Sequence, residues 1–186
     1  MSGITMEMQR SSAAVAVAAL GQLLRSSHGE APTKVGQLFV WNEVVSLAET
    51  AGSVEKKFLD DPTLPGFIVH AAGKVVGILS RRTLLTAISQ PFGREVFIKR
   101  PLHELVQHLD SKPLILEAST TIAAALRFAM GRRDDMRFEP CLVKTGQAVG
   151  LLEMHVLMLA QANLLEEAMT SKDTLIAKIK MILGDN

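Results

Sequence analysis

The 186-residue chain has only one cysteine, Cys141, so it cannot build a disulfide framework of its own. Cysteine usage this low fits a reducing compartment, and we expect a cytoplasmic protein. The chain also has almost no excess of charge of one sign, since its formal net charge at pH 7 is +1. A bulk electrostatic attraction to nucleic acid or to an anionic membrane is therefore not expected. No apolar run approaches the roughly 18 residues that a membrane-spanning helix needs, so no membrane span is predicted.

Sequence motifs that carry catalysis are missing as well. The five histidines do not have metal-ligand spacing with one another or with Cys141, which we expect to be a buried apolar residue. The acidic pairs Asp60–Asp61 and Asp134–Asp135 lie in predicted turns, which explains them without acid–base catalysis. Neither a Walker phosphate loop nor a Gly-x-Ser-x-Gly nucleophile elbow is found. We therefore predict a protein that is not an enzyme and has no metal site.

The chain does contain an internal repeat. The stretch Gly73–Thr83 and the stretch Gly146–Glu153 share a glycine turn, a short apolar strand, a second glycine, two more apolar residues and the start of a helix. An apolar run precedes each stretch, Phe67–Val69 in the first and Cys141–Val143 in the second. Two apolar runs around a glycine turn predict a β-hairpin. The period of about 70 residues is too long for a solenoid and indicates a duplicated half of a domain.

Each half is predicted to contain one further strand and one further helix. In the first half we expect the strand at Val35–Val40, then Trp41 as a packing anchor, and a helix that begins with Ser53 as its cap. In the second half we expect the strand at Pro113–Glu117 and the helix over about residues 119–130. The order strand, helix, strand, strand, helix in both halves predicts a mixed α/β (α+β) fold in which helices cover one side of a sheet.

Additional helices are predicted at both ends, from about Met6 to Arg25 and from about Glu153 to Leu183. The second of these carries apolar residues at alternating spacings of three and four, which is typical of a coiled-coil seam. The seam contains Leu165, Ala168, Lys172, Leu175, Ile179 and Ile182. We expect it to pair with a second copy of the chain. The alternative is that it docks on its own domain or on the Ala13–Leu24 face of the N-terminal helix.

With these motifs the chain resembles a tandem pair of cystathionine-β-synthase (CBS) domains. The resemblance rests on the β-α-β-β-α order in both halves and on the repeated Gly-x-x-Val-Gly hairpin with its following helix. It implies two repeats related by a pseudo-twofold, at residues 35–92 and 93–160, flanked by an N-terminal helix and linker at 1–34 and a helical extension at 161–186. It also implies a homodimer, and clefts between the repeats that hold ligands such as AMP, ATP or S-adenosylmethionine.

The family's ligand motif is Gly-h-h-Thr/Ser-x-x-Asp, where h is apolar. Its hydroxyl residue caps a helix beside the phosphates, and its Asp accepts hydrogen bonds from the ribose hydroxyls. The first copy keeps the hydroxyl as Ser80 but has Thr83 in place of the Asp, while the second copy has Glu153 and Val156 at the two positions. The resemblance therefore implies a partial ligand site in the first cleft, formed by Ser80, Arg81, Arg82 and Thr83, and a poor site in a second cleft near Glu153.

The resemblance implies a non-catalytic regulatory module that dimerises, senses an adenosyl-type ligand and acts on an attached domain or a separate effector protein. The loss of both acidic ribose acceptors leaves an alternative open. In that alternative the chain is a ligand-independent module for dimerisation and signal relay.

Overall fold

Two three-stranded sheets of the same design form the centre of the molecule, in a computed structural model that describes residues 31–108 and 112–184. The first sheet has the order β1 (Val44–Ser46), β2 (Gly66–Ala71), β3 (Lys74–Ser80). The second has the order β4 (Ile115–Glu117), β5 (Cys141–Thr145), β6 (Ala148–Leu152). In both sheets the first pair of strands is parallel and the second pair is an antiparallel hairpin. This matched topology confirms the predicted mixed fold of two β-α-β-β-α repeats.

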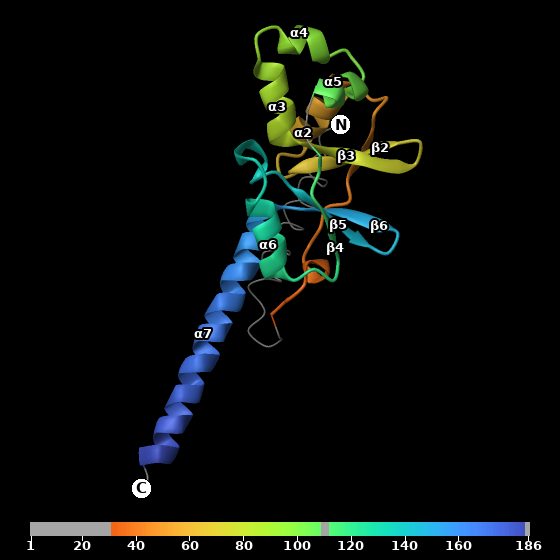
Figure 1. The fold of residues 1–186 in the computed structure, drawn as a ribbon. Coiled ribbons are helices and arrows are strands. Elements are labelled where there is room, and N and C mark those ends of the chain that lie inside the picture. Colours follow the sequence, from red (N-terminus) through yellow and green to blue (C-terminus); the bar gives the residue numbers. More distant parts are fainter. Residues whose placement is uncertain (1–30, 109–111, 185–186) are drawn as a thin grey trace, which may run out of the picture.

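Helices follow the strands in the predicted order (Figure 1). Helix α2 (Ala51–Asp60) follows β1, and α3 (Arg81–Ser89) follows β3 together with the short helices α4 (Gly93–Phe97) and α5 (Leu102–His108). Helix α6 (Ile122–Met130) follows β4 and α7 (Met154–Gly184) follows β6, and the 3-10 turns η2 (Val35–Gln37) and η3 (Asp134–Met136) complete the described elements. Three of the described helices begin at a hydroxyl cap, because the side chains of Thr50, Ser80 and Thr121 each accept a hydrogen bond from the amide three residues later.

The two hairpins are equivalent at their second glycines, although their turns differ. Gly77 pairs with Val69, and Gly150 pairs with Val143. The turn glycines Gly73 and Gly146 both have a positive φ, of 75° and 62°, which glycine adopts without strain. Relative to its turn glycine, the first hairpin turns one residue earlier than the second, since the innermost pairs are Ala71 with Lys74 and Thr145 with Ala148. A register shift after Val69 compensates for this difference. The equal glycine spacing in the sequence therefore corresponds to equal pairing in the structure.

Apolar side chains form two cores, and the chain segment before β1 joins them. The core of the first repeat includes Leu142 and Leu151 from the second repeat as well as Trp41. Trp41 and Leu151 exchange backbone hydrogen bonds, with N···O distances of 2.8 and 2.7 Å. Trp41 is thus the packing anchor that the sequence predicts. The second core contains Cys141, which is buried as expected.

Two sequence-based predictions in the first repeat are wrong. Residues 35–40 do not form a strand, because Val35–Gln37 turn as a 3-10 helix in which the Gln37 side chain accepts hydrogen bonds from the amides of residues 33 and 34. The first strand is β1, which the sequence analysis missed. Ser53 is not a helix cap but the third residue of α2, and its amide donates to the Thr50 hydroxyl. The helix predicted over residues 6–25 lies outside the described residues.

The C-terminal helix prediction is confirmed, since α7 runs without interruption from Met154 to Gly184. None of the helices within residues 31–108 and 112–184 is long and apolar enough to cross a membrane.

Candidate functional site

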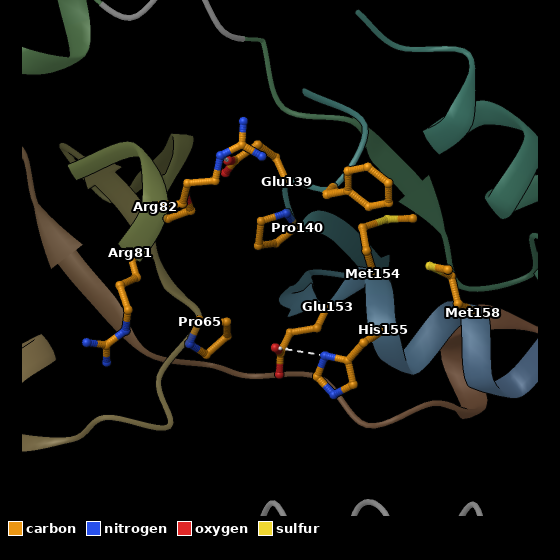
Figure 2. A pocket seen from close by; sticks show the side chains of 11 residues that line it. Pro65, Arg81, Arg82, Glu139, Pro140, Glu153, Met154, His155 and Met158 are labelled. Atoms are coloured by element: carbon orange, nitrogen blue, oxygen red, sulfur yellow. Dashed lines mark ion pairs between the residues drawn. The ribbon is translucent and has the colours of Figure 1, made fainter. Parts of the chain in front are cut away.

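A cleft of about 390 Å³ lies where the two repeats meet (Figure 2). Its walls come from the loop before β2, the end of β3 with the start of α3, the loop before β5, and the start of α7. The lining residues are Pro65, Ser80, Arg81, Arg82, Phe138, Glu139, Pro140, Glu153, Met154, His155 and Met158. The cleft therefore brings three of the four predicted site residues, Ser80, Arg81 and Arg82, to one wall, facing residues of the second repeat.

Ser80 holds the start of α3 in place. Its hydroxyl accepts from the amide of Thr83 at 3.0 Å and donates to the Thr83 hydroxyl at 2.8 Å. The Arg81 amide already donates to the Pro65 carbonyl at 2.9 Å. The capped helix end thus has two of its first amides engaged inside the protein, which reduces its capacity to bind an anion.

The guanidinium of Arg81 is bound mainly by residues of the first repeat and not by residues of the cleft. Its guanidinium donates to the carbonyls of Asp61 and Leu64, at 2.6 and 3.1 Å, and its Cζ lies 4.7 Å from the centre of the Phe58 ring. Burial lowers the pKa of this guanidinium, and the charge of Asp61 opposes that shift. In Figure 2 the guanidinium points away from Glu153 and His155 across the cleft. We conclude that Arg81 fixes the loop before β2 instead of offering its charge to a ligand.

Glu139 is a site residue that the sequence analysis missed. It precedes β5 in the second repeat and its side chain is only 8% exposed. Its carboxylate accepts from the Thr83 hydroxyl at 3.3 Å and lies 3.7 Å from the Arg82 guanidinium. Arg82 also donates to the Asp135 carbonyl at 3.0 Å. Ser80, Thr83, Glu139 and Arg82 therefore form one polar network across the junction of the two repeats.

Thr83 does not line the main cleft. With Ile78, Pro113, Met136, Glu139 and Pro140 it borders a smaller crevice of about 20 Å³. A crevice of this size is too small for a nucleoside, so the main cleft is the candidate site at the junction of the two repeats.

Glu153 lies in the same cleft as Ser80, which corrects the prediction of two separate clefts for these residues. Its carboxylate accepts from the Trp41 indole at 2.7 Å and forms a contact of 3.2 Å with the His155 imidazole. The dashed line in Figure 2 marks the second contact. Glu153 is thus held by Trp41 of the first repeat and His155 of α7. The sequence could not show this arrangement, because the indole and the carboxylate are 112 residues apart.

The charges of the cleft are balanced. Arg81 and Arg82 supply two positive charges, and Glu139 and Glu153 supply two negative charges. Apolar side chains complete the walls. Two of them are exposed to solvent, Phe138 to 59% and Met158 to 46%. This arrangement suits a ligand with an apolar ring and a few polar groups better than a highly charged anion.

Comparisons of this fold with solved structures give consistent neighbours. The CBS-pair protein CBSX2 from Arabidopsis thaliana has a TM-score of 0.54 and 17% sequence identity, over 72% of this chain and 97% of its own. The chain has the fold of a CBS-domain pair. A CBS-domain protein of Agrobacterium tumefaciens has a TM-score of 0.55 and 18% identity, over 72% of this chain and 96% of its own. A CBS-domain protein of Thermotoga maritima has a TM-score of 0.52 and 20% identity, over 68% of this chain and 92% of its own.

A second structure of CBSX2 contains AMP, and it matches this CBS-pair fold with a TM-score of 0.53 and 17% identity, over 72% of this chain and 98% of its own. By sequence, no known family profile and no curated protein matches the chain. The recognisable relationship is therefore one of fold, as the hairpin repeat in the sequence predicts.

Proposed function

We propose that this chain is a non-catalytic regulatory CBS-pair module whose inter-repeat cleft binds a small adenosyl-type ligand. The observation that carries the proposal is the cleft of about 390 Å³, which joins the capped start of α3 to a carboxylate of the other repeat. Its volume lies in the range of small-molecule sites. The AMP complex of a protein with the same fold supports the choice of ligand class.

Glu139 supplies the carboxylate that the sequence motif lacks. In the family motif an Asp accepts the ribose hydroxyls, and here Thr83 occupies its position. The Thr83 hydroxyl donates to Glu139, so a carboxylate from the second repeat reaches the place where the Asp would lie. We assign to Glu139 the role of ribose acceptor, with Ser80 and Arg82 beside it.

The balanced charges predict which adenosyl compounds bind. Arg81 is engaged by backbone carbonyls and Arg82 faces Glu139, so the cleft has little positive charge free for a polyphosphate. Glu153 would repel additional phosphates. We expect AMP and S-adenosylmethionine, which has a positive sulfonium, to bind more tightly than ATP.

Titration calorimetry with AMP, ATP and S-adenosylmethionine tests the site. We expect Glu139→Gln to weaken adenosyl binding by about tenfold, because a hydrogen bond to a charged acceptor contributes roughly 1.5 kcal/mol or more. Glu95→Gln is the matched control, since Glu95 lies on α4, does not line the cleft and is exposed. Thermal unfolding of each variant without ligand separates lost binding from lost folding. Equal affinity of the wild type and Glu139→Gln would contradict the assignment.

The alternative function is a ligand-independent module for dimerisation and relay. It is supported by the observation that Glu153, Arg82 and Glu139 already have partners within the chain. A ligand that binds only the folded state must raise the melting temperature. If no adenosyl compound shifts it, the ligand-free relay is the better description.

The assembly that we propose for this module is a homodimer in the cytoplasm that acts on an effector domain or protein. The homodimer is supported by the long C-terminal helix, whose apolar residues remain exposed in the single chain.

A further inference from the structure

The distal part of α7 extends away from the two sheets. Figure 1 shows the helix running from the second repeat to an isolated C-terminal end. Its first turns belong to the second core through Met154, Leu157 and Ala160, among others. From Leu165 to Leu183 every residue is exposed among the described residues. These 19 residues span roughly 28 Å at 1.5 Å per residue, and they lack the tertiary packing from which helices in proteins gain most of their stability.

One side of this distal helix is apolar. Residues at spacings of three and four form the stripe. Met169, Ile176 and Leu183, which lie seven residues apart beside them, widen it. Its large members are Leu165 with 57% exposure, Met169 with 68%, Leu175 with 60%, Ile176 with 40%, Ile179 with 46%, Ile182 with 73% and Leu183 with 70%. Ala168 and Lys172 complete the stripe. An exposed apolar stripe of this length, interrupted at Lys172, is typical of a protein-binding surface.

The position of Lys172 selects the partner's orientation. Lys172 lies within the stripe itself, one turn after Ala168. In a parallel pair of identical helices, Lys172 would face Lys172 of the second copy, and two like charges would share one layer of the seam. In an antiparallel pair, each Lys172 faces an apolar residue of the other helix instead.

We propose that this stripe binds the same stripe of a second copy of the chain in an antiparallel helix pair centred between Asp173 and Thr174. In this register Leu165 packs on Ile182 of the second copy, and Ala168 packs on its Ile179, so small and large side chains alternate. Lys172 packs its alkyl stem against Leu175 of the second copy and extends its ammonium toward the neighbouring Asp173. The proposal rests on the homodimer of the preceding section and does not require a ligand in the cleft.

Disulfide trapping of the full chain tests the orientation. Cys141 is buried, so introduced thiols report on the helix. Leu165→Cys and Ile182→Cys chains are mixed under reducing conditions and then oxidised. We expect covalent dimers between the unlike chains and few between like chains. Efficient linking of Leu165→Cys to itself would show a parallel pair and overturn the orientation. Ala177→Cys, on the opposite side of the helix, is the control that should link poorly in every mixture.

Sedimentation of the full chain tests the surface itself. We expect Leu175→Asp to raise the dimer dissociation constant at least roughly tenfold, because each copy then places a charge in an apolar seam. Ala177→Asp adds the same charge two residues away on the other side, and it should leave the dimer intact. A wild-type chain that remains monomeric, as it would if its own segment at residues 13–24 covered the stripe, overturns both the homodimer and the helix pair. Equal effects of the two variants would exclude the stripe as the interface.

Discussion

Glu139 links the two repeats through a single side chain. It is a nearly buried carboxylate, and such a group is costly to desolvate unless it is paired. Its partners Arg82 and Thr83 both come from the first turn of α3. A change in the position of α3 relative to the second repeat would therefore leave the charge without partners. In the proposed function, a ligand in the cleft would act on this network directly.

The buried thiol of Cys141 gives a prediction at the same scale. Its side chain packs in the second core, and burial raises the pKa of the thiol, an effect that the charge of Arg132 only partly opposes. Because the thiolate is the reactive form, we expect native protein to react slowly with a disulfide reagent at neutral pH. The reaction should become fast once denaturant exposes the core. Fast labelling of the native chain, at a rate unaffected by denaturant, would contradict the buried position.

At the scale of elements, the two hairpins make different use of matched glycines. A Cβ on Gly150 would lie 2.4 Å from Cγ2 of Val40, whereas a Cβ on Gly77 would meet nothing within 4 Å. We expect Gly150→Ala to lower the free energy of unfolding by about 1–3 kcal/mol, because Val40 must move from the strand that it packs on. Gly77→Ala should stay within about 0.5 kcal/mol of the wild type.

Urea denaturation of the two variants measures this difference, and each serves as the control for the other. Equal losses in both would mean that the glycines are needed for strand geometry and not for the approach of residues 40–42.

The sequence predicts elements well where local chemistry decides them. Both hairpins, the Ser80 cap and the long α7 follow from glycine turns, a hydroxyl before a helix and an uninterrupted helical pattern. Residues 35–40 depart from the predicted strand because their apolar run suits a strand, while the residues that bend this segment are distant in the sequence. The amide of Gly36 donates to the carbonyl of Ala118, on the other repeat. The site was only half predictable for the same reason, since Glu139 and Thr83 meet across 56 residues of sequence.

At the scale of the whole molecule, a single helix, α7, contributes residues both to the cleft and to the exposed stripe. Glu153 immediately precedes α7, and Met154, His155 and Met158 of its first turns line the cleft. The same helix continues without a break into the stripe that begins at Leu165. Because a rigid helix moves as one body, a displacement of its N-terminal turns also displaces its C-terminal end. Ligand binding and dimerisation are therefore expected to influence each other.

Thermodynamic linkage makes that expectation measurable, because two coupled binding events must change each other's affinity by the same factor. Pairing of α7 would restrain its first turns, so a ligand that orders the cleft loses less conformational entropy in the dimer. We expect AMP to bind the dimer more tightly than the monomer, by about fivefold or more, the lower range of typical couplings. Titrations at chain concentrations above and below the dimer dissociation constant measure the factor. The Leu175→Asp chain should show one concentration-independent affinity, and a wild type that behaves in the same way would mean that the cleft and the helix pair are uncoupled.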